Sequence, residues 1–229
     1  MKLLLCNDDG IDAPGLEALA QAGAHFGEVI VAAPASPQSG MSHAITYDRR
    51  FRVEERAPGR FAVSGMPADC ARVGLHRLAP DANWVLSGIN HGGNLGADVH
   101  YSGTVAAVRE AVLHGWPGIA VSQYRHDQRE LDWPRATEWV IGVLKQLFAT
   151  PSATGTFYNV NLPHLDRADP DPEVVFCPLD PRPLPLSFHH DPEEGALYNG
   201  DYQARERVPG ADVDVCFSGK IAVTVLRLF

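Results

Sequence analysis

The sequence has little positive charge and no long apolar run. Its 229 residues include 19 Lys and Arg against 28 Asp and Glu, so the net charge at pH 7 is -9. A chain of this sign has no basic field that could neutralise a phosphate backbone, which argues against long nucleic acids as partners. No window approaches the roughly 18 apolar residues that a membrane-spanning helix needs, so we expect no membrane partner either.

Cysteine is scarce as well. The four cysteines show no C-x-x-C spacing, and we interpret them as reduced core thiols, neither zinc ligands nor a disulfide framework. The apolar run at residues 3–6 meets two aspartates at once, whereas a secretory signal needs roughly 7 to 15 apolar residues. We therefore expect a cytoplasmic protein.

What the sequence does contain is an ordinary globular composition, with 45% hydrophobic and 21% charged residues. Short apolar runs alternate with segments of helical periodicity, which is typical of an α/β fold with a mainly parallel sheet. We expect one domain, with an α/β core over residues 1–162 and a proline-rich extension with a terminal strand over about 163–229. The expected strands are 3–6, 28–33, 46–53, 60–63, 84–87, 118–122, 157–161, 213–217 and 220–228, and the expected helices are 14–22, 66–78, 105–113 and 133–148.

Three polar loops each follow an expected strand of the parallel sheet. The first carries Asp8 and Asp9, the second Ser39 and Gly40, and the third Asn90 and Asn94. Since ligands bind beyond the carboxyl ends of strands in open α/β sheets, these loops can meet at one edge. Carboxylate, hydroxyl and amide oxygens suit Mg²⁺ or Mn²⁺ better than zinc or copper. Alone, the Asn-Asp-Asp-Gly segment could equally be a surface turn.

The glycine-rich segment 88–96 matches neither common nucleotide fingerprint, because it has no G-x-G-x-x-G and no G-x-x-x-x-G-K-[ST]. Its glycines could still bring backbone N–H groups close to an anion. The tripeptide Ser102-Gly103-Thr104 lies where a helix begins, which is either a phosphate site or a plain helix cap.

Five sequence blocks stand out in order from residue 1 to about 122. They are Asn7-Asp8-Asp9-Gly10 with Ala13-Pro14-Gly15-Leu16, Ala33-Pro34 with Gln38-Ser39-Gly40, Ser64-Gly65-Met66-Pro67-Ala68-Asp69-Cys70, Ser87-Gly88-Ile89-Asn90 with Gly93-Asn94-Leu95-Gly96, and Tyr101-Ser102-Gly103-Thr104-Val105. Together these blocks resemble the survival protein SurE family of metal-dependent 5'/3'-nucleotidases. The last hundred residues match less distinctly.

The resemblance implies a three-layer Rossmann-like domain that hydrolyses nucleoside monophosphates. It also implies a homodimer or homotetramer in which a β-rich C-terminal extension is exchanged between subunits. One Mg²⁺ or Mn²⁺ per subunit is implied, with metal ligands at Asp8, Asp9, Ser39 and Asn90. The residues implied on the phosphate side are Asn94, Ser102, Gly103 and Thr104, to which we add Ser39, Gly40 and Gly93.

The expected catalytic residues are Asp8, Asp9, Asn94 and Ser102. We expect Asp8 to orient or deprotonate a water while Asn94 and Ser102 hold phosphate oxygens; attack by an aspartate itself is the competing chemistry. His43 receives a structural or substrate-contact role, and Asp98 no catalytic one. Two other functions stay open: a nucleotide-binding regulatory module without turnover, and another Mg²⁺-dependent phosphatase, although the haloacid dehalogenase type needs Asp-x-Asp.

Overall fold

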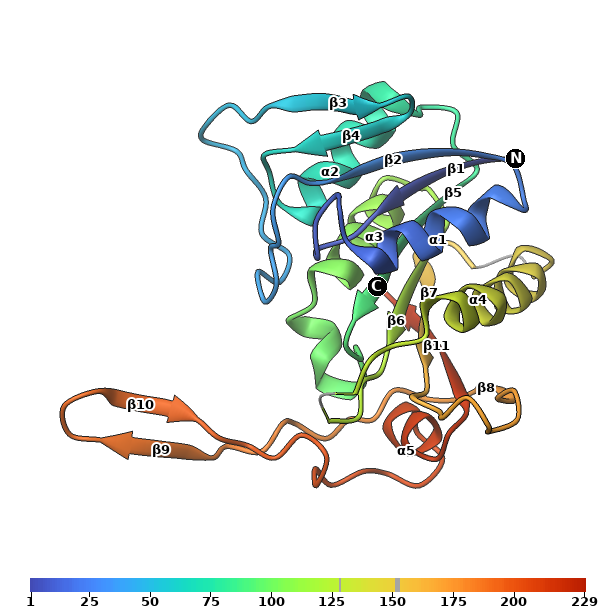
Figure 1. The fold of residues 1–229 in the computed structure, drawn as a ribbon. Helices are drawn as coiled ribbons and strands as arrows, with labels where there is room; N and C mark the ends of the chain where they lie inside the picture. The colour runs from blue at the N-terminus through green and yellow to red at the C-terminus, as the bar shows by residue number, and fades with distance from the viewer. Residues whose placement is uncertain (128, 151–152) are drawn as a thin grey trace.

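The computed structural model describes residues 1–127, 129–150 and 153–229. Within this part of the chain, nine strands form one sheet in the order β3-β4-β2-β1-β5-β6-β7-β11-β8 (Figure 1). Neighbouring strands from β4 to β7 are parallel, whereas β3 and β11 run antiparallel to β4 and β7. The predicted α/β class with a mainly parallel sheet is confirmed.

The central strands are apolar over nearly their whole length because helices cover both faces of the sheet. The strands of the sheet are β1 (Lys2–Cys6), β2 (Glu28–Pro34), β3 (Val53–Ala57), β4 (Arg60–Val63), β5 (Trp84–His91), β6 (Gly118–Gln123), β7 (Thr156–Leu162), β8 (Val174–Phe176) and β11 (Ile221–Arg227).

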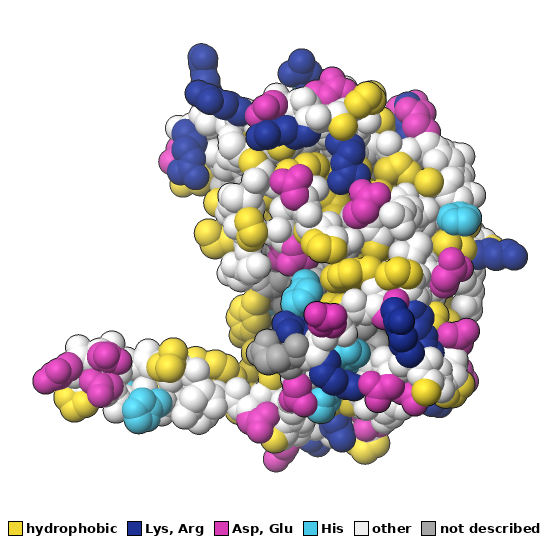
Figure 2. Space-filling view, in the orientation of Figure 1, with side chains coloured by type: hydrophobic (Ala, Val, Ile, Leu, Met, Phe, Trp, Pro, Cys, Tyr) yellow, Lys and Arg dark blue, Asp and Glu magenta, His cyan; other side chains and the backbone are white. Residues whose placement is uncertain are grey.

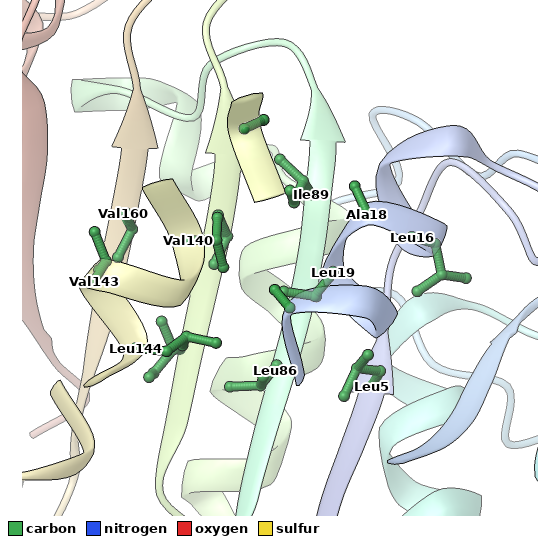
Figure 3. Packing of buried hydrophobic residues seen from close by; sticks show 14 of the residues in the cluster. Leu5, Leu16, Ala18, Leu19, Leu86, Ile89, Val140, Val143, Leu144 and Val160 are labelled. Atoms are coloured by element: carbon green, nitrogen blue, oxygen red, sulfur yellow. The ribbon is translucent and has the colours of Figure 1, made fainter. Parts of the chain in front are cut away.

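Two pairs of helices enclose the sheet. Helices α1 (Pro14–Ala24) and α4 (Trp133–Phe148) pack together on one face, and α2 (Pro67–Val73) packs with α3 (Gly103–Leu113) on the other. A π-helical turn, η1 (Gly74–Leu78), extends α2. Figure 3 shows the first layer, in which apolar side chains of α1 and α4 meet those of the strands: Leu5, Leu16, Leu19, Leu86, Ile89, Val140, Val143, Leu144 and Val160.

The order of the strands creates a switch point next to β1. The chain leaves β1 for β2 on one side and later returns to β5 on the other side. At such a point the loops that leave the two neighbouring strands diverge, and a crevice opens beyond their carboxyl ends. The loops after β1 and β5 border this crevice.

Two expected elements need correction. Residues 213–217 belong to a helix, α5 (Asp212–Phe217), although their alternating pattern predicted a strand. The carboxylate of Asp212 accepts hydrogen bonds from the backbone of Gly96 and Asp180, both at 2.8 Å, and these tertiary contacts fix the start of the helix. The first hairpin strand covers Val53–Ala57 and not 46–53, because the tight turn at Pro58-Gly59 sets its pairing with β4.

The C-terminal extension has two parts. Strands β9 (Phe188–Asp191) and β10 (Gly195–Tyr198) form a hairpin that projects from the body, with hydrophobic side chains along it (Figures 1 and 2). Leu186 and Leu197 are 93% and 70% exposed. The chain then returns through α5 to β11, which completes the main sheet between β7 and β8. Within the described residues, no helix is long and apolar enough to cross a bilayer.

Candidate active site

The turn after β1 presents two carboxylates to the crevice. The Asn7 side chain holds this turn, since its Nδ2 donates to the Gly10 carbonyl at 2.8 Å and its Oδ1 accepts from the Gly10 amide at 3.3 Å. Asp8 is only 5% exposed, and Asp9 is half-buried. The turn predicted from the Asn-Asp-Asp-Gly segment is therefore real, and it fixes two carboxylates instead of merely reversing the chain.

Thr104, in the first turn of α3, joins the ends of β1 and β5. Its hydroxyl donates a hydrogen bond to Asp8 Oδ1 and lies 3.3 Å from Asn90 Oδ1. The side chain is completely buried. The structure thus brings together three of the predicted site residues, Asp8, Asn90 and Thr104, with the hydroxyl between the two acceptors.

The N-terminus of α3 lies against Asp8. A Cβ atom added to Gly103 would lie 2.8 Å from Asp8 Cβ and 3.0 Å from Asp8 Oδ2, so only glycine permits this approach. Ser102 caps the helix, and its Oγ accepts from the Val105 amide at 3.1 Å. Since a helix N-terminus favours negative charge, the crevice combines anionic side chains with a backbone that attracts anions.

Burial changes the acidity of both aspartates. It raises the pKa of Asp8 to about 6; the neighbouring Asp9 charge adds to this rise and the Thr104 hydroxyl opposes it. Burial also raises the pKa of Asp9, although the His91 amide donates to its Oδ2 at 3.0 Å and stabilises the ionised form. A cation beside two such carboxylates would favour their ionised forms.

The second loop is fastened beside the first. The Gln38 amide donates to the Asp8 carbonyl at 2.8 Å, and Ser42 Oγ donates to the His100 carbonyl at 2.6 Å. Ser39 and Gly40 lie between these two anchors and are exposed. Their predicted contacts with metal and phosphate stay predictions, but the loop that carries them borders Asp8.

His43, further along the same loop, has a structural contact. Its Nε2 lies 2.8 Å from the carboxylate of Glu110, a residue of α3 with a nearly buried side chain. The His114 Nε2 atom approaches the other oxygen of the same carboxylate at 3.1 Å. His43 therefore ties the second loop to α3.

The third loop follows an irregularity in β5. Pairing between β5 and β6 shifts after Ser87 and resumes at Asn90, and such bulges redirect side chains at strand ends. Asn90 Nδ2 donates to the Gly92 carbonyl at 2.9 Å, which leaves its Oδ1 toward Thr104. Gly93, also predicted on the phosphate side, is half-buried in this loop.

Asn94 lies deeper than the sequence indicated. Its Nδ2 donates to Ser122 Oγ at 2.7 Å, and its backbone amide donates to Asn161 Oδ1 at 2.8 Å. The side chains of Asn159 and Asn161 both donate to the Asn94 carbonyl. This buried polar network fixes Asn94 to the ends of β6 and β7.

Comparison with known proteins places this geometry in a family. The family model of the survival protein SurE matches residues 3–180. The chain belongs to the SurE family. A relative from Nostoc sp. (strain PCC 7120) is 49% identical over 230 residues, which span 100% of both chains. The 5'-nucleotidase SurE of Roseobacter denitrificans is 37% identical over 99% of this chain and 94% of its own.

The fold also matches a solved SurE structure. The crystal structure of the Aquifex aeolicus SurE protein has a TM-score of 0.88 at 28% identity, covering 100% of this chain and 94% of that one. All the predicted site residues lie within the region that the SurE family model matches. The hairpin β9–β10 and helix α5 lie beyond its end at residue 180.

Sequence reasoning missed some polar residues of this SurE-family site. Asn159 and Asn161 were taken only as part of an apolar strand, and Ser122 as the end of another. One signal was available, since asparagines at alternate positions of an otherwise apolar strand lie on the same face. Such residues need polar partners when buried, and here they hold the Asn94 loop.

The side chains at the end of β1 and β5 offer oxygen ligands for a divalent cation. Within the described ranges, no group of three or more His, Cys, Asp and Glu side chains could hold a metal. An ion here would therefore need the two carboxylates of Asp8 and Asp9 together with neutral oxygens. The amide oxygen of Asn90 is joined to Asp8 through Thr104, and such an oxygen set suits Mg²⁺ or Mn²⁺. The residues fit the group.

Proposed function

We propose that this protein is a divalent-metal-dependent nucleotidase that hydrolyses nucleoside 5'-monophosphates to nucleoside and phosphate, with 3'-monophosphates as further candidate substrates. The pair of Asp8, which is buried, and Asp9, which is half-buried, carries this proposal, because beside the N-terminus of α3 it places cation-binding and anion-binding groups in one crevice. The Roseobacter denitrificans relative is named a 5'-nucleotidase, which supports nucleoside 5'-monophosphates as the substrate class.

The proposed metal ligands are Asp8, Asp9, Ser39 and Asn90, and the proposed cofactor is one Mg²⁺ or Mn²⁺ per subunit. When bound, such an ion neutralises charge on the phosphate and lowers the pKa of a water. Thr104 holds Asp8 and Asn90 at a fixed separation, so these ligands need little rearrangement to bind. Because Ser39 and Asn90 are neutral, they do not cancel the positive charge of the ion, which can then attract the phosphate of the substrate.

The side chains of the chain would divide the remaining work. Asn94, Ser102 and the first amides of α3 bind phosphate oxygens, and the helix dipole favours this anion. Asp8 orients the attacking water and accepts its proton, because Thr104 fixes the direction of its carboxylate. In the competing chemistry, an aspartate attacks phosphorus and forms an aspartyl-phosphate. Acid quench during turnover of a ³²P-labelled nucleoside monophosphate separates the two, because ³²P bound covalently to an aspartate would exclude direct attack by water.

We also propose a homodimer or homotetramer built through the C-terminal hairpin. The hairpin extends away from the body (Figures 1 and 2). Its residues Phe188 and Leu197 are exposed. An isolated hairpin of this kind is only marginally stable in water, so a second copy of the chain is its natural partner. The length of the arm suits exchange between subunits.

Phosphate release from nucleoside monophosphates tests the function. With Mn²⁺ or Mg²⁺, we expect turnover of 5'-monophosphates, loss of turnover in EDTA and recovery when metal is restored. Asp9→Asn should lower kcat at least about a hundredfold, because it removes a charged ligand. Asp12→Asn is the matched control, since it removes the same charge from an exposed position three residues away.

Three outcomes would contradict the proposal. Full activity in chelator would exclude the metal requirement, and an active Asp9→Asn variant would exclude the ligand assignment. Tight nucleotide binding without phosphate release, at any metal concentration, would instead favour a regulatory module.

A further inference from the structure

A short turn separates two residues that the proposed function places on the phosphate. This turn, η2 (Gly96–His100), begins just after Asn94 and ends just before Ser102. Asp98 spans it, since its Oδ2 accepts from the Leu95 amide at 3.1 Å and its carbonyl accepts from the Ser102 amide at 3.1 Å. The conformation of this one residue therefore sets the spacing between the two ends of the turn.

Two residues of the C-terminal segment bind the Asp98 carboxylate. The Tyr202 hydroxyl donates to Asp98 Oδ2 at 2.5 Å, and Arg205 Nη1 approaches this oxygen at 3.2 Å. Arg205 Nη2 also donates to the Leu95 carbonyl at 3.0 Å. The side chains of Arg205 and Asp98 are only 4% and 12% exposed, so this ion pair is largely shielded from solvent.

The turn and its anchor fit each other closely. Gly96 has a φ of +55°, and a Cβ atom there would lie 2.7 Å from Arg205 Nη2. The Gly96 amide donates to Asp212 at the start of α5, at 2.8 Å. The Arg205 guanidinium lies over the Tyr202 ring, 4.9 Å from its centroid. Four separate contacts thus fasten a five-residue turn to a segment more than a hundred residues away.

A shielded ion pair is a weak source of stability, because desolvation offsets most of its attraction. The network does fix geometry, since the Asp98 carboxylate is held in one orientation by a hydroxyl, a guanidinium and a backbone amide. A displacement of about 1 Å at a reacting centre can cost about a hundredfold in rate. The network therefore has more effect on the placement of the turn than on the free energy of folding.

We infer that Asp98, Tyr202 and Arg205 are positioning residues that keep Asn94 and Ser102 at the spacing that phosphate binding requires. The inference rests on the proposed function, which it extends to the C-terminal segment beyond the residues that the family model matches. None of the three touches the phosphate. They act through the turn. Tyr202 and Arg205 lie just after β10, at the root of the hairpin arm, so this root is part of the site.

Tyr202→Phe tests the inference because it removes one hydroxyl and keeps the ring. Tyr124→Phe is the matched control: the Tyr124 hydroxyl donates to Gln203 of the same segment, whereas the Tyr202 hydroxyl donates to Asp98 of the turn. Hydrogen exchange and steady-state kinetics are measured on the full-length wild-type and variant proteins. In Tyr202→Phe we expect amides of residues 94–103 to exchange at least about threefold faster. We expect its kcat to fall about tenfold with a smaller change in KM.

Asp98→Asn and Arg205→Lys should change the same two measurements in the same direction, with Arg205→Lys milder because it keeps the charge. Exchange at 94–103 that matches wild type in Tyr202→Phe would overturn the inference. Faster exchange with unchanged kcat would overturn it too, because the turn would then not position catalysis. Hydrogen exchange needs no substrate, so it tests the hold on the turn independently of the proposed function. An inactive wild-type protein would refute the proposed function, and it would also refute the expected effect of the turn on kcat.

Discussion

At the scale of single residues, the site depends on the ends of strands. Asp8, Asp9 and Asn90 were predictable because polar residues that follow buried parallel strands converge at one sheet edge. The contact of Thr104 with Asp8 and Asn90 was not predictable, since it requires knowing how the first turn of α3 packs against β1. Sequence reasoning named Thr104 on the phosphate side but did not predict that its hydroxyl connects Asp8 and Asn90.

The acidity of Asp8 has a cost for the metal-free protein. Its pKa is about 6 in the fold and 3.8 as an ordinary carboxyl group, so the folded state binds the proton more tightly. The resulting stabilisation is complete below about pH 4 and is lost as pH rises through about 6. Above that pH, ionised Asp8 destabilises the fold by up to about 3 kcal/mol, at 1.36 kcal/mol for each pKa unit.

Asp8→Asn should therefore stabilise the metal-free protein at pH 7.5 while abolishing turnover. We expect its Tm to exceed that of wild type by several degrees at this pH, on the order of 2–4 °C per kcal/mol. The difference should shrink toward pH 4.5, where wild-type Asp8 is protonated. Thermal unfolding in EDTA at the two pH values measures this.

Asp12→Asn supplies the comparison, because Asp12 is exposed. It should leave Tm nearly constant at both pH values. A lower Tm for Asp8→Asn than for wild type at pH 7.5 would show that the ionised carboxylate stabilises the apo fold, contrary to this argument.

At the scale of elements, local pattern predicted most strands and helices but failed where tertiary contacts decide. The Val-Asp-Val-Cys segment 213–216 fits a strand by alternation. It forms a helix because Asp212 is bound by backbone amides of two distant segments. The proline-rich extension also supplies β8 (Val174–Phe176), since a short strand can join a sheet edge with few constraints.

Helix α3 has a glycine that ordinary helix propensity would replace. Gly103→Ala would place a Cβ atom 2.8 Å from Asp8 Cβ and 2.9 Å from Pro67 Cγ. The first turn of α3 must then move away from Asp8. We expect at least about a tenfold loss of kcat, because small displacements at the reacting centre are costly. Steady-state kinetics with a nucleoside monophosphate would measure the loss.

Gly142→Ala in α4 is the counterpart. A Cβ atom there would meet nothing within 4 Å, so the substitution should stabilise the protein by about 0.5–1 kcal/mol and leave kcat unchanged. Equal activity of the Gly103→Ala and wild-type enzymes would show that the close approach of α3 to Asp8 is not required.

At the scale of the whole molecule, the hairpin arm has two ends with different surroundings. Its tip contributes no residue to the crevice of its own chain, whereas its root, at Tyr202 and Arg205, grips the turn beside it. The sequence indicated an exchanged arm only through its family resemblance. Its projection and exposed side chains are properties of the fold that no local pattern contains.

Replacing residues 188–198 with a short Gly-Ser linker should therefore reduce the size of the assembly without unfolding the subunit. We expect light scattering to report a smaller oligomer and the far-UV circular dichroism to keep its α/β shape. The milder variant Leu197→Asp places a charge on the same surface and should act in the same direction. An unchanged oligomer in both variants would exclude the hairpin as the contact between subunits.

The position of β11 between β7 and β8 has a consequence for synthesis of the protein. Every residue of β7 is buried, and one of its two neighbours is made from residues 221–227. A chain that contains β7 but has not yet paired residues 221–227 with it thus carries an open strand edge of otherwise buried residues. Until β11 closes it, this edge can pair with another chain and aggregate.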